Sequence, residues 1–370
     1  MHKVTFFPLG NADCYRIDLH NGKKILTDYA NVKDTEDDED LRIDLAAALR
    51  EDLDEAHRNE YDVVAFTHAD DDHIHGFSDF FYLEHAKKYQ DDSRARINVL
   101  WVPAAVITES SLKDEARVLQ AEARHRIKVG KGLRVFSRPE HLKDWFDSEK
   151  ISLESRRVLI TDAGQICPEF TLGTDGIEFF VHSPFATRQE GQLIDRNDAA
   201  LVTHATFLIG SRTTRMMLGS DCEHEAWADI VRITEYKSRL DRLDWDIFKI
   251  AHHCSYTALS AEMGEEKTKP DAEVERLFKR GQQKGILVAT CKPIPSDDSD
   301  DQPPHRQAAN YYREIAKGLA GDFKVTMEYP RESRPEPLVI QIDDFGATLK
   351  KLTVASGASV LTRPAPRAGR

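Results

Sequence analysis

The residues most able to do chemistry in this chain lie close together, at positions 67–76. Two imidazoles and two carboxylates fall within six residues of this stretch, at His68, Asp70, Asp72 and His73. Imidazole nitrogen and carboxylate oxygen together suit zinc, manganese or iron, so this spacing predicts a metal centre. The alternative interpretation is a solvated acidic loop, which is how most aspartate-rich runs are used.

A buried strand is the element that must position this stretch. Residues 61–66 form an apolar run directly before it, and a polar loop at the end of a rigid strand gives a metal site firm support. Two further polar clusters follow predicted strands: Gly-Ser-Asp, ending at Asp221, comes after 215–218, and His-His-Cys-Ser, ending at Ser255, comes after 246–251. Because all three clusters lie at strand ends, we expect them to share one site.

Predicted strands and helices alternate along the chain in two runs. Residues 14–19 and 24–27 read as strands joined by an Asn-Gly turn, a strong signal for a two-residue hairpin. Further strands are predicted at 4–7, 97–102, 158–161, 170–172, 177–181, 199–209, 285–290, 324–328 and 338–342. Helices are predicted at 41–58, 77–89, 223–237 and 307–317. Each run combines strands with flanking helices, which indicates a layered sandwich with two sheets facing inward.

Two segments stand apart from this pattern. Residues 108–150 are mostly helical and charged, and they read as an insertion that could be a lid, a surface for a protein partner, or plain packing, of which packing is favoured. Beyond Phe345, the tail at 346–370 becomes basic and rich in proline with nothing to bury, so its end is expected to be disordered.

Composition restricts the classes of partner. The formal charge of −13 argues against broad, charge-driven adhesion to nucleic acid. It does not exclude a local basic groove that leads to a cationic metal centre. Five scattered cysteines without a close pair favour a reducing compartment over a disulfide framework. No apolar run is long enough to span a membrane, and the N-terminus lacks the pattern of a signal peptide. We therefore expect a cytoplasmic protein with no membrane partner.

Taken together, these motifs resemble the metallo-β-lactamase fold family, whose general pattern after the strand is His-x-His-x-Asp-His. Here Asp70 replaces the second histidine, and that variant resembles the hydrolase domain of the DNA-uptake protein ComEC. Further resemblances to this branch occur at the turn ending at Asp13, at Asp28, at 182–184, at 197–202, at 218–221, at 249–255 and at 304–305. The resemblance spans about residues 3–343. It implies an α/β fold, a metallo-β-lactamase-like four-layer αββα sandwich, in one hydrolase domain over residues 1–345.

The resemblance also implies two adjacent metal positions. The first would rest on His68, Asp70 and Asn197. Asn197 stands where other branches of the family place a third histidine, so this first position is weakened. The second position would use Asp72, His73 and His253, with Asp221 placed to bridge two ions. The cofactor is then one or two divalent ions, zinc or manganese, and the oxygen-rich ligands move the preference toward manganese.

The implied chemistry is hydrolysis by a metal-activated water. The catalytic candidates are Asp72, Asp221 and His305. His305 could donate a proton or contact substrate, and the alternative is an ordinary surface histidine beside Pro304. Three residues are candidates for orienting ligands through hydrogen bonds, namely His252, Ser255 and His75. The alternatives are a surface position for His75 and a loop cap for Ser255.

Three functions remain open at this point. The ComEC-like pattern implies a nuclease or phosphodiesterase acting on nucleic acid or another phosphodiester. The same fold also hydrolyses small esters, lactones, thioesters or cyclic nucleotides. A third possibility is a metal-binding or metal-free protein that binds a partner through 108–150, which the altered ligands at Asp70 and Asn197 keep open.

Overall fold

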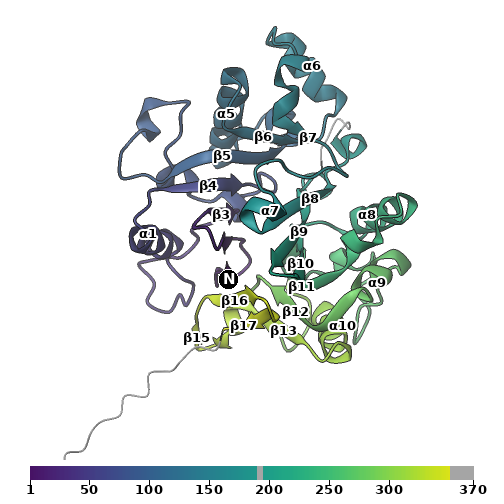
Figure 1. Cartoon of the computed structure of the whole chain (residues 1–370). Coiled ribbons are helices and arrows are strands. Elements are labelled where there is room, and N and C mark those ends of the chain that lie inside the picture. The colour runs from purple at the N-terminus through teal and green to yellow at the C-terminus, as the bar shows by residue number, and fades with distance from the viewer. Residues whose placement is uncertain (190–194, 351–370) are drawn as a thin grey trace, which may run out of the picture.

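Two β-sheets organise the chain, and the computed structural model describes residues 1–189 and 195–350 (Figure 1). The first sheet has the strand order β17-β16-β1-β2-β3-β4-β5-β6-β7. Its strands are β1 (His2–Phe6), β2 (Tyr15–Asp18), β3 (Lys24–Thr27), β4 (Glu60–Ala65), β5 (Arg96–Pro103), β6 (Leu133–Phe136), β7 (Ile160–Thr161), β16 (Leu338–Asp343) and β17 (Gly346–Leu349). From β3 to β7 neighbouring strands run parallel, so their carboxyl ends lie at one edge.

The second sheet has the order β13-β12-β11-β10-β9-β8. Its strands are β8 (Ile177–Ser183), β9 (Val202–Ile209), β10 (Arg212–Gly219), β11 (Trp245–Lys249), β12 (Gly281–Ala289) and β13 (Asp322–Val325). Strands β10 to β13 are parallel, so their carboxyl ends also lie at one edge. A separate short hairpin joins β14 (Pro330–Arg331) to β15 (Arg334–Pro335).

An apolar layer fills the space between the two sheets. Val4 and Trp101 of the first sheet belong to the same buried cluster as Phe179 and Ile247 of the second. Alternate residues of a strand point to opposite faces, so each sheet also presents an outer face that needs cover. Helices provide that cover on both sides.

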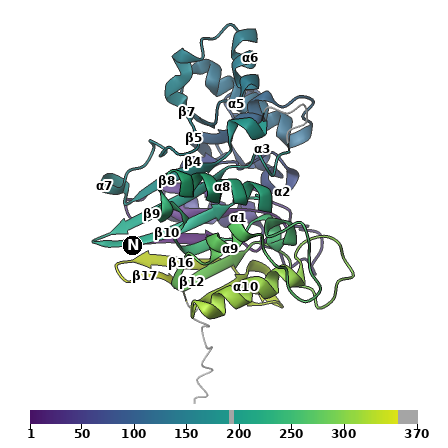
Figure 2. The same ribbon diagram turned by 90° about the vertical axis from the view of Figure 1, so that its right-hand side faces the viewer.

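The main helices form the two outer layers. The first sheet is covered by α1 (Leu45–Glu55), α5 (Asp114–Val129) and α6 (Glu140–Ser148), and the second by α8 (His224–Tyr236), α9 (Ala272–Phe278) and α10 (Arg306–Gly318). Figure 2 shows α8, α9 and α10 in front of the strands of the second sheet. On α1, Leu45, Leu49 and Leu53 are buried, as their spacing of four predicts. The predicted four-layer αββα sandwich is confirmed.

Shorter helical segments connect these layers. The short α-helices are α2 (Asp71–Ile74), α3 (Phe77–Phe80), α4 (Ala104–Thr108) and α7 (Leu172–Asp175). The 3₁₀ turns are η1 (Lys87–Tyr89), η2 (Glu154–Leu159), η3 (Ala186–Gln189), η4 (Leu240–Leu243), η5 (His252–Cys254), η6 (Tyr256–Ala258) and η7 (Thr326–Glu328). Within the described residues, the helices all lack the combination of length and apolarity that a membrane crossing requires.

Four expectations from the sequence differ from the structure. The helix predicted at 77–89 is interrupted, because α3 ends at Phe80 and the separate turn η1 covers only Lys87–Tyr89. Segment 108–150 is more than a helical insertion, because β6 lies in the first sheet between β5 and β7 with all four residues buried. The tail begins later than predicted, since Gly346–Leu349 form β17 against β16, and residues 351–370 lie outside the described part of the chain. The strand predicted at 170–172 is absent because Thr171 caps α7, its side chain accepting the N–H of Thr174 at 3.2 Å.

Candidate metal centre

The carboxyl ends of four strands bring the candidate residues together. Asp28 follows β3, and the 67–76 stretch follows the adjacent parallel strand β4. In the second sheet, Asp221 follows β10 and His253 follows its parallel neighbour β11. Loops at the carboxyl ends of parallel strands share one edge of their sheet, which is where open α/β sheets place their sites.

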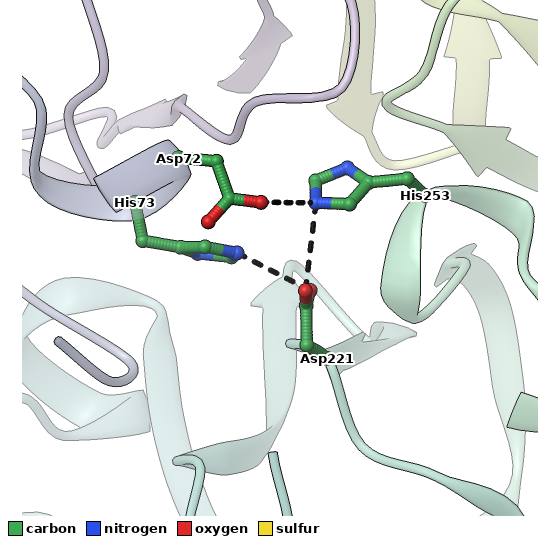
Figure 3. Close-up of side chains that lie close together, drawn as sticks. All are labelled: Asp72, His73, Asp221 and His253. Atoms are coloured by element: carbon green, nitrogen blue, oxygen red, sulfur yellow. Dashed lines mark hydrogen bonds and ion pairs between the residues drawn. The ribbon is translucent and has the colours of Figure 1, made fainter. Parts of the chain in front are cut away.

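Four side chains converge where the two edges meet, and we call Asp72, His73, Asp221 and His253 the four-residue centre (Figure 3). Nε2 of His253 lies 3.0 Å from Oδ2 of Asp72 and 3.4 Å from Oδ2 of Asp221. Nε2 of His73 lies 3.3 Å from Oδ1 of Asp221. The ligand atoms of all four residues lie within 4.8 Å of one another, so one cation could contact them together.

Each histidine of the four-residue centre is oriented through its other ring nitrogen. Nδ1 of His73 lies 2.8 Å from a carboxylate oxygen of Asp28, and Nδ1 of His253 lies 2.8 Å from the backbone carbonyl oxygen of Thr290. Both oxygens only accept, so Nδ1 carries the proton in each ring, and in the neutral imidazole Nε2 keeps its lone pair. A ligating histidine typically donates its other N–H to a carboxylate or a carbonyl in this way.

Asp28 is itself held in place. Its carboxylate accepts hydrogen bonds from the backbone N–H of Thr67 at 2.7 Å and from the Thr67 hydroxyl at 2.8 Å. Its backbone has φ of 55°, in the left-handed region, which turns the chain at the end of β3. Asp28 therefore positions His73, although the sequence assigned it no specific role.

The backbone that carries His253 is unusual. His252, His253 and Cys254 all have positive φ, at 50°, 48° and 66°, although none of them is glycine. Non-glycine residues pay a conformational cost in this region, and such residues gather at functional sites. The sharp turn after β11 is what aims His253 back toward Asp221.

Buried polar atoms of the site lack partners within the described chain. Nε2 of His68, Nε2 of His73 and Oδ1 of Asp221 are buried without a hydrogen bond, since the contact between the last two does not meet hydrogen-bond geometry. Buried polar groups are almost always satisfied, and leaving one unpaired is costly. A divalent cation would satisfy lone pairs on nitrogen and oxygen together, so the donor set fits a metal ion.

The pKa values of the histidines and of Asp221 are shifted by their mutual charges. Burial lowers the pKa of His253, but the carboxylates of Asp221 and Asp72 outweigh burial and raise it to about 10. For His73, burial is likewise outweighed by Asp221 and Asp28, and its pKa lies well above the ordinary value. The pKa of Asp221 is held well below its usual range, since the two histidines outweigh burial. The site therefore has a strong preference for positive charge.

His68 and Asp70 lie beside the four-residue centre. The rings of His68 and His73 have centroids 4.0 Å apart, and Nε2 of His68 is 3.5 Å from a carboxylate oxygen of Asp70. The other oxygen of Asp70 is ion-paired with Arg196. Arg196 in turn pairs with Glu109 at 2.6 Å. Sequence reasoning missed both partners because their charges carry no local motif.

Asn197 is placed near the site by its backbone. It belongs to a turn in which its carbonyl oxygen accepts the N–H of Ala200 at 3.2 Å, and Leu201 then donates to the carbonyl of Thr67 at 2.9 Å. In the described chain, no hydrogen bond joins the Asn197 side chain to the four-residue centre. Its role as a ligand stays a prediction.

The residues expected to support the ligands lie at the border of the site. His252 is half-buried, and its Nδ1 lies 3.1 Å from the hydroxyl oxygen of Thr257. Ser255 caps the next turn, its hydroxyl accepting the N–H of Thr257 at 3.2 Å. His75 is on the surface, where it pairs with Asp71 at 3.0 Å. In the described part of the chain, none of these three contacts a carboxylate of the four-residue centre.

His305 occupies the N-cap position of α10 and faces a different cavity. Its ring packs edge-on against Tyr256 at 4.8 Å, and Nδ1 accepts the N–H of Tyr256 at 3.4 Å. The cavity it lines has a volume of about 180 Å³ and includes Asp297, Asp298, Asp300 and Asp301. The proposed proton donor thus sits among carboxylates outside the four-residue centre.

A buried ion pair lies behind His73. Asp13 and Lys249 are both 1% exposed and contact each other, and Asp13 Oδ2 is 3.9 Å from Nδ1 of His73. The backbone N–H of Asp13 donates to the carbonyl of Asp72 at 2.9 Å. Burial lowers the pKa of Lys249, but Asp13 and Asp221 outweigh it and raise the value, so the lysine stays charged. The pair ties the first sheet to the second beside the centre.

No protein-family model and no curated protein matches the chain. Solved structures that match it include the metallo-β-lactamase GOB-18 from Elizabethkingia meningoseptica, at 13% identity over 75% of this chain and 87% of that one, with a TM-score of 0.32. The class B3 di-zinc metallo-β-lactamase LRA-12 from an Alaskan soil metagenome matches at 11% identity over 85% and 91%, with a TM-score of 0.33. A diphosphatase from the PhnP family matches at 9% identity over 95% and 100%, with a TM-score of 0.33. With TM-scores this low, these likenesses assign no chemistry to the site of this chain.

Proposed function

We propose that this protein is a metal-dependent hydrolase that cleaves phosphodiester bonds. The observation that carries the proposal is the geometry of the four-residue centre, in which two oriented imidazoles and two carboxylates converge on one point. His73 and His253 each hold Nδ1 on an acceptor and turn Nε2 inward, as ligating histidines do. This donor set suits zinc, manganese or iron.

A divalent ion in such a centre lowers the pKa of a bound water and polarises the bond to be cleaved. Asp72 is the member of the centre that solvent reaches, since its side chain is 37% exposed while those of His73 and Asp221 are at most 5% exposed. Burial raises the pKa of Asp72, but His73 and His253 outweigh it and hold the value below its usual range. Asp72 therefore stays ionised at neutral pH and can accept a hydrogen bond from the attacking water.

The choice of phosphodiester as substrate rests on two observations. The first is the resemblance of the 67–76 stretch to the ComEC hydrolase pattern. The second is Arg196, whose guanidinium lies beside Asp70 at the border of the centre with its side chain 29% exposed. A planar guanidinium matches the oxygens of a phosphate group better than it matches a neutral ester or lactam.

The test combines metal content with cleavage. We expect wild-type protein purified without chelator to carry a divalent ion, and Asp221→Asn to lose it, as measured by elemental analysis. A linear oligonucleotide and bis(p-nitrophenyl) phosphate, supplied with manganese, zinc or magnesium, should be cleaved by the wild type and not by Asp221→Asn. The control is Asp92→Asn, which alters a fully exposed carboxylate and should change neither result.

Two outcomes would contradict the proposal in different ways. A well-folded wild type that binds no metal after reconstitution would remove the metal centre altogether. Bound metal without Asp221-dependent cleavage of either substrate would leave the centre standing and refute the phosphodiester assignment.

A further inference from the structure

Arg196 lies against the position where the sequence predicted a first metal ion. Its Nη1 contacts a carboxylate oxygen of Asp70 and the carbonyl oxygen of Ala69, the latter at 3.3 Å. Its Nε and Nη2 contact the carboxylate of Glu109 at 3.0 and 2.6 Å. The guanidinium is therefore held from two sides by opposite charges.

Glu109 is a fixed anchor for this arginine. Its backbone N–H donates to the carbonyl of Ala105 at 2.8 Å and closes α4, and its own carbonyl accepts the side-chain amide of Gln120 on α5 at 2.9 Å. The paired contacts of Arg196 on Glu109 set the plane of the guanidinium. This ion pair therefore fixes the position of the Arg196 guanidinium.

The arginine takes up the carboxylate that a first metal position would need. Asp70 offers one oxygen to Arg196 and has the other 3.5 Å from Nε2 of His68. An ion bound between His68 and Asp70 would sit within a few ångströms of the guanidinium, and like charges at that distance repel. Among the described residues, the carboxylates of the four-residue centre contact histidines, and the charge of Lys249 behind them is paired with Asp13.

We propose that Arg196 replaces a second metal ion. The four-residue centre then holds a single divalent ion, and the guanidinium supplies the second positive charge beside His68. This inference rests on the proposed function, because it assumes that the centre binds metal, and it deepens that function by defining the charge of the site.

The experiment counts ions per chain by elemental analysis after equilibration with excess manganese or zinc followed by dialysis. We expect one ion in the wild type and two in Arg196→Gln, because that variant frees Asp70 and removes the competing charge. Arg196→Lys keeps the positive charge and should stay at one. Arg276→Gln is the matched control, since Arg276 also makes paired contacts to a glutamate, Glu235, on the outer helices, and it should also stay at one.

Circular dichroism and thermal melting would reveal whether Arg196→Gln folds poorly. In that case a second variant, Asp70→Asn, still tests the inference. Asp70→Asn should still bind one ion with unchanged affinity, because Asp70 is not a ligand in this arrangement. Loss of the ion in Asp70→Asn would overturn the inference. So would two ions in the wild type, or one ion in a folded Arg196→Gln. No ion in the wild type would instead refute the metal centre itself, and the inference with it.

Discussion

Asp28 accepts a hydrogen bond from Nδ1–H of His73 at 2.8 Å, and this contact turns Nε2 of His73 toward Asp221. The carboxylate comes from the end of β3 and the imidazole from α2, so the two residues are 45 positions apart in the chain. The candidate metal centre therefore depends on a residue that is not one of its four members.

Asp28→Asn should weaken metal binding by about 10–100-fold, because the amide that replaces the carboxylate cannot accept from Thr67 and His73 in the same way. Asparagine tolerates the left-handed backbone of this position, so the fold should persist. Competition with a chromophoric chelator measures the affinity. Asp62→Asn removes a carboxylate that accepts a backbone N–H from Lys24 and should leave the affinity unchanged. Equal affinities in both variants would contradict the role of Asp28.

Lys249→Met should destabilise the protein by about 3–5 kcal/mol, because it leaves the carboxylate of Asp13 buried without its partner. Urea unfolding measures the loss. The double variant with Asp13→Asn should recover part of it, since both buried charges are then gone. Lys279→Met removes an exposed lysine that pairs with Glu275 and should cost less than about 1 kcal/mol. An equal loss in the free energy of unfolding for both variants would show that the buried pair stabilises the protein no more than an exposed one.

Gly219→Ala should lower both stability and metal content. A Cβ at this position would lie 2.5 Å from Cζ2 of the buried Trp227 indole, and the strand must shift to relieve the overlap two residues before Asp221. Overpacking of this kind costs about 1–3 kcal/mol. Gly173→Ala is the comparison, because nothing lies within 4 Å of its added Cβ. Thermal unfolding and elemental analysis of the two variants should differ, and identical results would refute the steric argument.

The stabilisation that Glu122 contributes should disappear in acid. Burial raises the pKa of Glu122, but the hydrogen bond from His85 and the charge of Arg126 outweigh it and lower the value to about 2. A carboxylate whose pKa is lowered by folding stabilises the protein at pH values above its ordinary pKa of 4.5. This stabilisation is lost as the pH falls toward 2. The wild type's advantage over Glu122→Gln should therefore shrink by up to about 3 kcal/mol across that range.

Urea unfolding at a series of pH values tests this dependence. Glu140→Gln provides the control, because Glu140 is exposed and its pair with Lys143 lies at the surface. The stability of that variant should track the wild type throughout. A difference between wild type and Glu122→Gln that stays constant with pH would mean that the buried carboxylate does not titrate as proposed.

Much of the fold could be predicted from local patterns. The spacing of Leu45, Leu49 and Leu53 indicates a helix with one buried face, and α1 is that helix. The apolar run before position 67 indicates a buried strand, and β4 is that strand. Short elements were harder, because β6 has only four residues and carries too little pattern to separate it from the helices around it.

The sequence by itself determined the chemical types at the strand ends, since the side chains of Asp72 and His73 and the double histidine ending at His253 are encoded in short runs. Only the tertiary structure decided which of them meet. Arg196 reaches Asp70 across 126 positions, and Lys249 reaches Asp13 across 236. A single charged residue has no periodicity or motif to reveal its partner. Its pairing depends on how two sheets pack, and packing is a property of the whole chain.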